Sequence, residues 1–247
     1  MSIASLRREL LIMCLFRAAF VLSFTLTAVA GAPFGAQAAD NSLESVFRRM
    51  DQASTRFKGL KADMKKLSHT EVINEDSVDT GTIVVKATRP HELRILMDFE
   101  APDRKKVKID GTKVEIYYPK TNTVQEIDLG KNHRSQVEQF LRLGFGSSSQ
   151  DILGAYAVAL GGPQTIAGQA ATRIVLTPKS KELLAQFPKF ELWISDQTGI
   201  SIQQKMYQPG GDYSMATYAN MQVNPNLPDS AVNLNLPKGV TREYPQK

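Results

Sequence analysis

The chain contains three histidines and one cysteine, the residue types from which metal centres and nucleophilic sites are most often built. His69, His91 and His133 stand far apart, and no spacing of carboxylates or thiols around them predicts a triad or a metal cluster. Gly-x-Ser-x-Gly, phosphate-loop, Gly-x-Gly-x-x-Gly and His-Glu-x-x-His motifs are also missing from the sequence. These observations favour a binding protein without a metal or cofactor over an enzyme.

The chemistry that the sequence does indicate is the binding of an apolar ligand. Between residues 82 and 118, aliphatic side chains alternate with polar ones, as expected for antiparallel strands with one solvated face. The apolar face either forms an ordinary core, which composition alone favours, or lines a cavity. The sheet residues that we predict for such a cavity are Met64, Leu93, Ile95, Met97, Val107, Ile109, Val114, Ile116 and Met206.

An amphipathic helix precedes the strands. Asn41 and Glu44 have the spacing of a capping box. The apolar residues that follow at intervals of three and four are Leu43, Val46, Phe47 and Met50. This apolar stripe must cover another part of the molecule.

About eleven strands are predicted after this helix, with a hairpin turn at Asp110-Gly111. The alternation pauses at residues 132–153, where we expect a helix carrying Val137, Phe140 and Leu141, a flexible Gly/Ser break and a second short helix. A helical pattern also occurs at residues 179–187. The later strands are expected at residues 172–176, 190–195, 200–207, 213–220 and 232–234. So many strands with one apolar face predict a mainly β domain whose antiparallel sheet curls to cover that face.

Residues 1–38 have the features of a cleavable signal peptide. An apolar run at residues 18–30 follows a basic segment that contains Arg7, Arg8 and Arg17. The small residues Ala36-Gln37-Ala38 then fit the rule for signal-peptide cleavage. The run of about 13 residues is shorter than the roughly 20 that a membrane span needs, although an uncleaved anchor is the alternative. Export would leave residues 39–247 as one domain without a cysteine, because Cys14 lies in the signal. The expected location is the periplasm.

The charge balance gives no support for a nucleic-acid partner. The chain has 30 basic and 25 acidic residues, a formal charge of +5. Residues 1–38 hold three of the arginines and one of the glutamates, so the remainder carries 27 basic and 24 acidic residues. Phosphate binding requires basic residues concentrated on one surface, and a surplus of three does not predict this.

Several blocks of the sequence occur in the order that is typical of one family. The blocks are 81–86 leading to Arg89-Pro90, 93–95 leading to Pro102, 108–111 with 117–119, 176–178, and the ending 234–240. Together they cover nearly all of residues 40–241. With the signal peptide and the cysteine-free mature chain, the sequence resembles the periplasmic lipoprotein carriers of the LolA type.

This resemblance implies an unclosed antiparallel β-barrel with an N-terminal helix and a helical lid over an apolar cavity. It implies a monomer that receives acylated lipoproteins from an inner-membrane ABC-type extractor, shields their acyl chains and delivers them to an outer-membrane acceptor. Arg89 would latch the lid by donating to backbone carbonyls, and Val137, Phe140 and Leu141 would face the cavity from the lid. A guanidinium suits several carbonyl acceptors at once.

The cargo stays open at this stage. Leu93 and Ile95 are aliphatic where many members of the family carry aromatic residues, and residues 179–187 form a helical insertion. Relatives of this fold bind glycolipids or act as envelope sensors. A lipid-binding sensor or regulator, or a glycolipid carrier, is therefore the alternative to a lipoprotein carrier, followed by a structural outer-membrane subunit.

Overall fold

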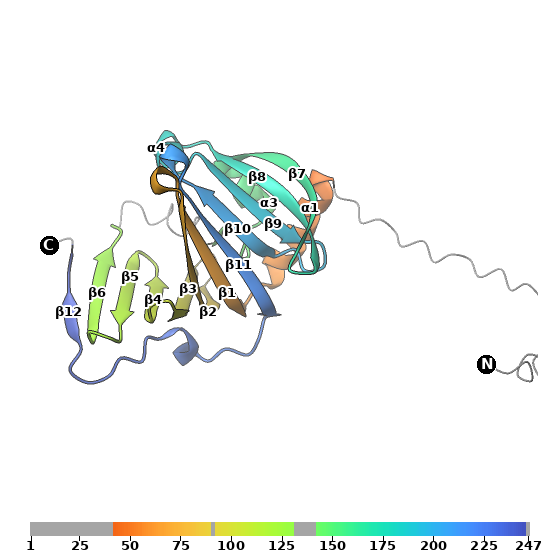
Figure 1. Ribbon diagram of the computed structural model, residues 1–247. Helices are drawn as coiled ribbons and strands as arrows, with labels where there is room; N and C mark the ends of the chain where they lie inside the picture. The colour runs from red at the N-terminus through yellow and green to blue at the C-terminus, as the bar shows by residue number, and fades with distance from the viewer. Residues whose placement is uncertain (1–41, 90–91, 131–141, 246–247) are drawn as a thin grey trace, which may run out of the picture. The chain divides into compact units, whose positions relative to one another are not determined.

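The structure, a computed structural model, describes residues 42–89, 92–130 and 142–245, all within one unit, Ala39–Lys247. Across these residues the chain forms one twelve-stranded sheet in the order β12-β6-β5-β4-β3-β2-β1-β11-β10-β9-β8-β7 (Figure 1). The two ends of this order, β12 and β7, do not pair with each other, so the sheet is open over the described part of the chain. The predicted fold class, a mainly β unclosed barrel, is confirmed.

All pairs of neighbouring strands are antiparallel except β12 and β6, which run parallel. The first six strands are β1 Gly59–Thr70, β2 Glu75–Arg89, β3 Glu92–Ala101, β4 Lys105–Asp110, β5 Lys113–Tyr118 and β6 Thr123–Asp128. The other six are β7 Tyr156–Ile166, β8 Gln169–Pro178, β9 Lys189–Ser195, β10 Ser201–Tyr207, β11 Tyr213–Val223 and β12 Thr241–Glu243. The predicted hairpin turn at Asp110-Gly111 is confirmed between β4 and β5, where Gly111 has a φ of 61°.

The predicted helices that fall within the described residues are present. They are α1 Leu43–Arg56, α3 Ser149–Ala155 and α4 Lys181–Gln186, and short 3-10 turns lie at η1 Glu71–Ile73, η3 Pro209–Gly211 and η4 Asp229–Val232. The predicted capping box of α1 is wrong by one residue. Ser42 is the N-cap, and its hydroxyl accepts from the Ser45 N–H at 3.2 Å, which leaves Glu44 in the first turn. No helix among the described residues has the length and hydrophobicity needed to cross a membrane.

The prediction of a strand at residues 232–234 is wrong. Val232 ends the 3-10 turn η4, and Leu234 packs beside Tyr117 and Val124 without joining the sheet. The last strand is β12, which starts at Thr241. Leu234 and Leu236 cover the outer side of β5 and β6, and Val232 lies in η4, which contacts β2 and β3. This covering role explains their strand-like pattern.

Besides β12, the strands β6 and β7 escaped the sequence patterns, and each of these two has a physical reason. In β6, Val124 is buried on the outer side whereas Ile127 pairs with Val114 on the other side, so no single apolar face develops. The edge strand β7 contains Gly161, Gly162 and Pro163 next to a register shift, and these residues are typical of turns.

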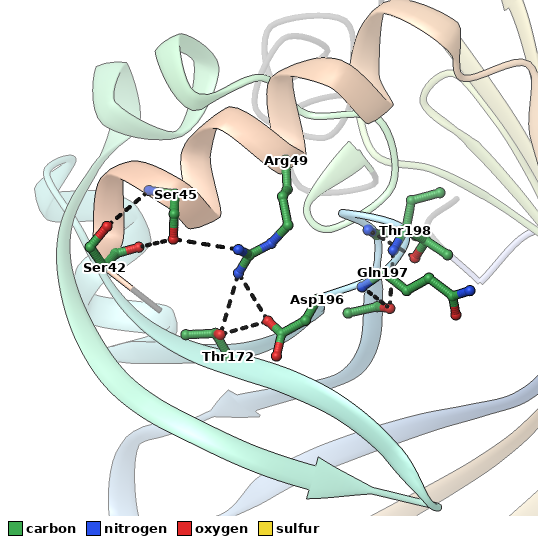
Figure 2. Close-up of polar contacts among 9 residues, drawn as sticks. Ser42, Ser45, Arg49, Thr172, Asp196, Gln197 and Thr198 are labelled. Atoms are coloured by element: carbon green, nitrogen blue, oxygen red, sulfur yellow. Dashed lines mark hydrogen bonds and ion pairs between the residues drawn. The ribbon is translucent and has the colours of Figure 1, made fainter. Parts of the chain in front are cut away.

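Helix α1 is fastened to the sheet by a polar cluster. Arg49 donates to the Asp196 carboxylate at 2.9 Å, and Thr172 donates to the same oxygen at 2.7 Å (Figure 2). Arg49 also lies 3.4 Å from the hydroxyls of Ser45 and Thr172, and its side chain is only 17% exposed. Figure 2 shows the guanidinium reaching from the helix to the strands below it. These contacts hold α1 in one position against β8 and the turn after β9.

A second contact joins α1 to α3. The Asp51 carboxylate accepts from the backbone N–H and the hydroxyl of Ser149, at 2.6 and 2.7 Å. The turn after β9 approaches α1 so closely that a Cβ on Gly199 would lie 2.3 Å from the carbonyl oxygen of Arg49. Helix α1 is therefore a fixed cover of the sheet.

Replacing Arg49 by Met should lower the free energy of unfolding by about 1–3 kcal/mol, because the carboxylate of Asp196 would lose its charged donor in a largely buried setting. Urea unfolding measures this change. The matched control is Arg48→Met on the exposed neighbouring position, for which we expect a change within about 0.5 kcal/mol. Equal losses for the two variants would contradict the anchoring role of Arg49.

His69 links the two strands of the β1–β2 hairpin. Its ring lies 2.7 Å from Asp76 and 3.1 Å from Glu71, and it stacks on Tyr213 at a centroid distance of 4.8 Å. The Lys205 ammonium lies over the same Tyr213 ring, 3.5 Å from its centroid, and Asp212 accepts from the Glu71 N–H. The hydrogen bond to Asp76, followed by that to Glu71, raises the pKa of His69 above 6.5.

Because the folded-state pKa of His69 is raised, its stabilising contribution is complete below pH 6.5 and is lost as the pH rises through the higher folded value. An NMR titration of the His69 ring should therefore give a pKa above 6.5. Asp76→Asn should move that pKa downward and weaken the decline of stability with rising pH. An unchanged titration in the variant would show that Asp76 does not set the pKa.

Candidate functional site

The register of the strands places the predicted cavity residues on one face. One apolar row crosses six strands through directly paired positions, namely Leu60, Val85, Ile95, Ile109, Val114 and Ile127. A second row runs beside it through Ala62, Ile83, Met97, Val107 and Ile116. Paired residues of antiparallel strands point to the same side, so the two rows form a continuous apolar surface from β1 to β6.

The sheet curls until distant strands meet around one cavity. A cavity of about 200 Å³ is lined by residues from strands as far apart as β4, which contributes Ile109, and β9, which contributes Phe190 and Leu192. These two strands are separated by five others, a distance of roughly 29 Å in a flat sheet at about 4.8 Å per strand. The apolar face is therefore the concave, inner side of the sheet.

Five of the residues predicted from the strand patterns line this cavity. They are Met64, Ile95, Met97, Ile109 and Met206. Ile95 is 4% exposed and Met64 is 4% exposed, so both belong to the buried wall. The rest of the wall is mostly apolar and includes Ile83, Leu143, Phe145, Phe190, Leu192, Ala216 and Tyr218, with Lys66, Gln204, Lys205 and Ser214 among its polar members.

The other predicted residues lie elsewhere. Val107, Val114 and Ile116 share the inner face, as the register shows, but they are half-buried and line neither the cavity nor a second hollow described below. Leu93 lines that second hollow. Val137, Phe140 and Leu141 lie outside the described residues.

A short segment fills the space between the helices and the sheet. Residues 142–147 run through the concave side, where Leu143 and Phe145 are 5% and 3% exposed. The Gln204 side chain donates to the Leu143 carbonyl at 3.0 Å, and the Ser201 N–H donates to the Gly144 carbonyl at 3.0 Å. Arg142 and Ser147 brace the turn, because Arg142 donates to Gly146 and Asp151 while Ser147 donates back to the Arg142 carbonyl.

Two glycines allow Phe145 to enter the cavity. Gly144 and Gly146 have φ values of 82° and 76°, a region that side chains disfavour. A Cβ on Gly144 would lie 2.7 Å from Ser201, and one on Gly146 would lie 2.8 Å from the Phe57 ring. The backbone thus passes close to β10 on one side and to the end of α1 on the other, and the Phe145 ring packs edge-on against Tyr218 at 5.1 Å.

The sequence patterns missed this segment. A Gly-Phe-Gly-Ser run indicates a flexible break, whereas the structure places it, buried and hydrogen-bonded, inside the concave face. The signal that could have identified it is a large aromatic residue between two glycines, since an exposed break has no need for such a side chain.

A second hollow, of about 360 Å³, lies on the other side of Phe145. We call it the polar cleft; its lining residues are Ser54, Phe57, Ala87, Thr88, Arg89, Glu92, Leu93, Arg142, Phe145 and Gly146. Arg89, the predicted latch residue, is 77% exposed in its side chain, and its Nε lies 3.9 Å from the Glu92 carboxylate. Its predicted acceptors, the carbonyls of the lid, lie outside the described residues, so the latch role stays a prediction.

The inner face is shielded from water, and this burial shifts the pKa values of two tyrosines. Burial raises the pKa of Tyr218, which lines the cavity, above its usual value, and burial raises the pKa of Tyr156 to about 12. Within the described residues, no group of three His, Cys, Asp or Glu side chains could hold a metal ion. The arrangement offers an apolar wall and few polar atoms, which suits the binding of hydrocarbon.

Truncating Phe145 should open the cavity. We expect Phe145→Ala to destabilise the protein by about 3 kcal/mol and to tighten the binding of a fluorescent fatty-acid probe by about tenfold, because the ring no longer has to be displaced. The control is Phe187→Ala, which removes the same ring from the cluster around Phe190 without changing the cavity lining. Probe affinities that fall, or that rise equally in both variants, would show that Phe145 does not occupy a ligand position.

Comparison with known proteins gives structural neighbours only. No family model and no curated protein matches the chain. Similar solved structures include MucB, with 13% identity over 77% of this chain and a TM-score of 0.48, and this chain covers 62% of that structure. They also include the lipoprotein LppX of Mycobacterium tuberculosis, with 13% identity over 78% of this chain and all of that one and a TM-score of 0.45. A LolA superfamily protein from Nitrosomonas europaea has 12% identity over 77% of this chain and 96% of that one, with a TM-score of 0.38.

Proposed function

We propose that this protein is a periplasmic carrier that shields the acyl chains of lipoproteins on their way from the inner to the outer membrane. The single observation that carries the proposal is the continuous apolar face of β1–β6, which leads into an apolar cavity on the concave side of an open sheet. Acyl chains are the biological ligands whose chemistry fits a long apolar surface with few polar groups.

The gain from burying an acyl chain is large enough to hold the cargo during transit. Each methylene removed from water contributes about 0.8 kcal/mol, so one long chain represents roughly 10 kcal/mol or more of gross burial. A carrier must also release its cargo, and a fully complementary cavity would hold it too tightly. An unfavourable free-energy term must therefore offset part of the gain from burying the acyl chain.

Residues 142–147 supply that offset in the closed structure. The cavity of about 200 Å³ is smaller than the about 300–1,000 Å³ of ordinary ligand pockets, because Leu143 and Phe145 occupy the adjoining space. A ligand must displace these side chains and their packing against Tyr218, which lowers the net affinity. In this proposal, α1 stays in place when a ligand enters, and residues 142–147 change position.

The place and partners that we propose for this transport are those that the signal-peptide pattern and the resemblance to LolA-type carriers imply. Residues 1–38, which lie outside the described part of the chain, would direct export. An ABC-type extractor in the inner membrane would load the carrier, and an acceptor at the outer membrane would receive the cargo.

A charge on the cavity wall should abolish binding. Ile95→Glu places a carboxylate where the acyl chain would lie, and burial of that charge against hydrocarbon is unfavourable. We expect a fluorescent acyl probe to lose measurable affinity for this variant. Val84→Glu is the matched control, since Val84 lies on the next strand but on the outer face, opposite Leu96; its probe affinity should equal that of the wild type.

The circular-dichroism spectrum and urea midpoint of each variant establish that it is folded. Should Ile95→Glu fail to fold, Met97→Phe tests the same wall by filling the cavity without adding charge, and it should weaken the probe as well. Full probe affinity in a folded Ile95→Glu variant, or equal losses in both glutamate variants, would refute binding at this wall.

A further inference from the structure

The polar cleft and the apolar cavity are separate spaces that share one lining residue, Phe145. The Phe145 ring is therefore the partition between the two spaces. Their volumes are about 360 and about 200 Å³. Movement of this one side chain would join the two spaces into a single site with a polar end and an apolar end.

Strand β3 runs along both spaces. Its inner-facing residues alternate along the strand, and Leu93 lines the polar cleft whereas Ile95 and Met97 line the apolar cavity. A ligand extended along this strand would therefore have its apolar part beside Ile95 and Met97 and its other end beside Leu93. This is the shape of a site for an amphiphile.

The polar groups of the cleft include two guanidinium groups. Arg89 and Arg142 both line it, together with the hydroxyl-bearing residues Ser54 and Thr88. Arg142 is 14% exposed and is held by the Asp151 carboxylate and the Gly146 carbonyl. Arg89 is much freer, because its described contact is the distant ion pair with Glu92 at 3.9 Å, and exposed pairs of this kind are weak.

We propose that the polar cleft binds the phosphate head group of an amphiphile whose acyl chain occupies the apolar cavity. This inference rests on the acyl-chain cavity of the proposed function and goes beyond lipoproteins, whose lipid anchor carries no phosphate, to phosphate-bearing amphiphiles that the same cavity would accept. Arg89 would donate two parallel hydrogen bonds to the phosphate, a geometry that guanidinium groups favour. Arg142 would add positive charge from the buried side, and Thr88 would donate a hydroxyl hydrogen bond.

Glu92 sets the strength of this site. Its carboxylate lies beside Arg89 and would repel a phosphate at the same place. A phosphate must compete with this carboxylate for the guanidinium, so the affinity for the head group stays moderate. A moderate affinity for the head group suits a carrier that must release its cargo.

The test compares two ligands that differ only in the phosphate. Palmitoyl monoacylglycerol and palmitoyl monoacylglycerol 3-phosphate, both below their micellar concentrations, compete with a fluorescent acyl probe for the wild-type protein. We expect the phosphate-bearing ligand to bind about tenfold more tightly, the size of an added charge-assisted hydrogen bond. Arg89→Gln should remove this advantage and leave the neutral ligand unchanged, and Glu92→Gln should increase the advantage.

The matched control is Arg94→Gln, which removes the same charge from the outer face of β3, where Arg94 pairs with Asp110 at 3.0 Å. It should keep the full preference for phosphate. Arg89 is exposed, so its variant should keep the urea midpoint of the wild type. Loosening of a lid by loss of a latch would change the affinities of both ligands together, which separates that role from head-group binding.

The outcomes distinguish the two proposals. Equal affinity of both ligands for the wild type, or an unchanged preference in Arg89→Gln, would overturn the head-group site while leaving acyl binding intact. Failure of both ligands to displace the probe would instead refute the proposed function. Inorganic phosphate alone should not compete at the concentrations of the amphiphile, and tight binding of inorganic phosphate to the cleft would overturn the assignment to a lipid head group.

Discussion

The structure depends on one constraint: the concave face of a twelve-stranded open sheet is apolar and must be covered. Two rows of paired aliphatic side chains cross β1 to β6, and the inner residues of β8 and β9 continue the surface beneath α1 and α3. A closed barrel would bury such a face against itself, but this sheet stays open within the described residues. The cover therefore has to come from helices and from residues 142–147, and the way each is attached decides whether a ligand can replace it.

The two kinds of cover are attached differently. Helix α1 buries Val46 and Met50 against the sheet and is fixed by the Arg49–Asp196 ion pair and by the contact of Asp51 with Ser149. Residues 142–147 instead bind the sheet through two hydrogen bonds to β10 and through the buried side chains of Leu143 and Phe145, the second of which lies between two glycines. A short segment outside the helices and strands can open locally at a lower free energy than the strands of the core. A fixed helix beside a displaceable segment gives a cavity that can be closed without a ligand and filled with one.

The sequence allowed the sheet to be predicted wherever one face was apolar and the other polar, as in β3 with Leu93, Ile95 and Met97. It failed where the pattern had a different cause. Val232 and Leu234 alternate like a strand because Leu234 covers the outer side of β5 and β6 while Val232 lies in η4, which contacts β2 and β3. Strand β6 was missed because Val124 and Ile127 are covered from opposite sides. An aromatic residue between two glycines indicates that Phe145 is not part of an exposed break, but the strand against which it lies could not be foreseen, because its position depends on the close approach of Gly144 to Ser201, a contact between segments far apart in the sequence.

Mass spectrometry of the lipids extracted from protein purified out of the periplasm tests the central claim most directly, since it asks what the concave face holds in the cell. We expect an acylated species, either a lipoprotein or a lipid, in an amount comparable to that of the protein, and much less of it from the Ile95→Glu variant. Protein that yields no acylated species, or that yields the same amount from the wild type and from Ile95→Glu, would contradict the conclusion that this face binds acyl chains.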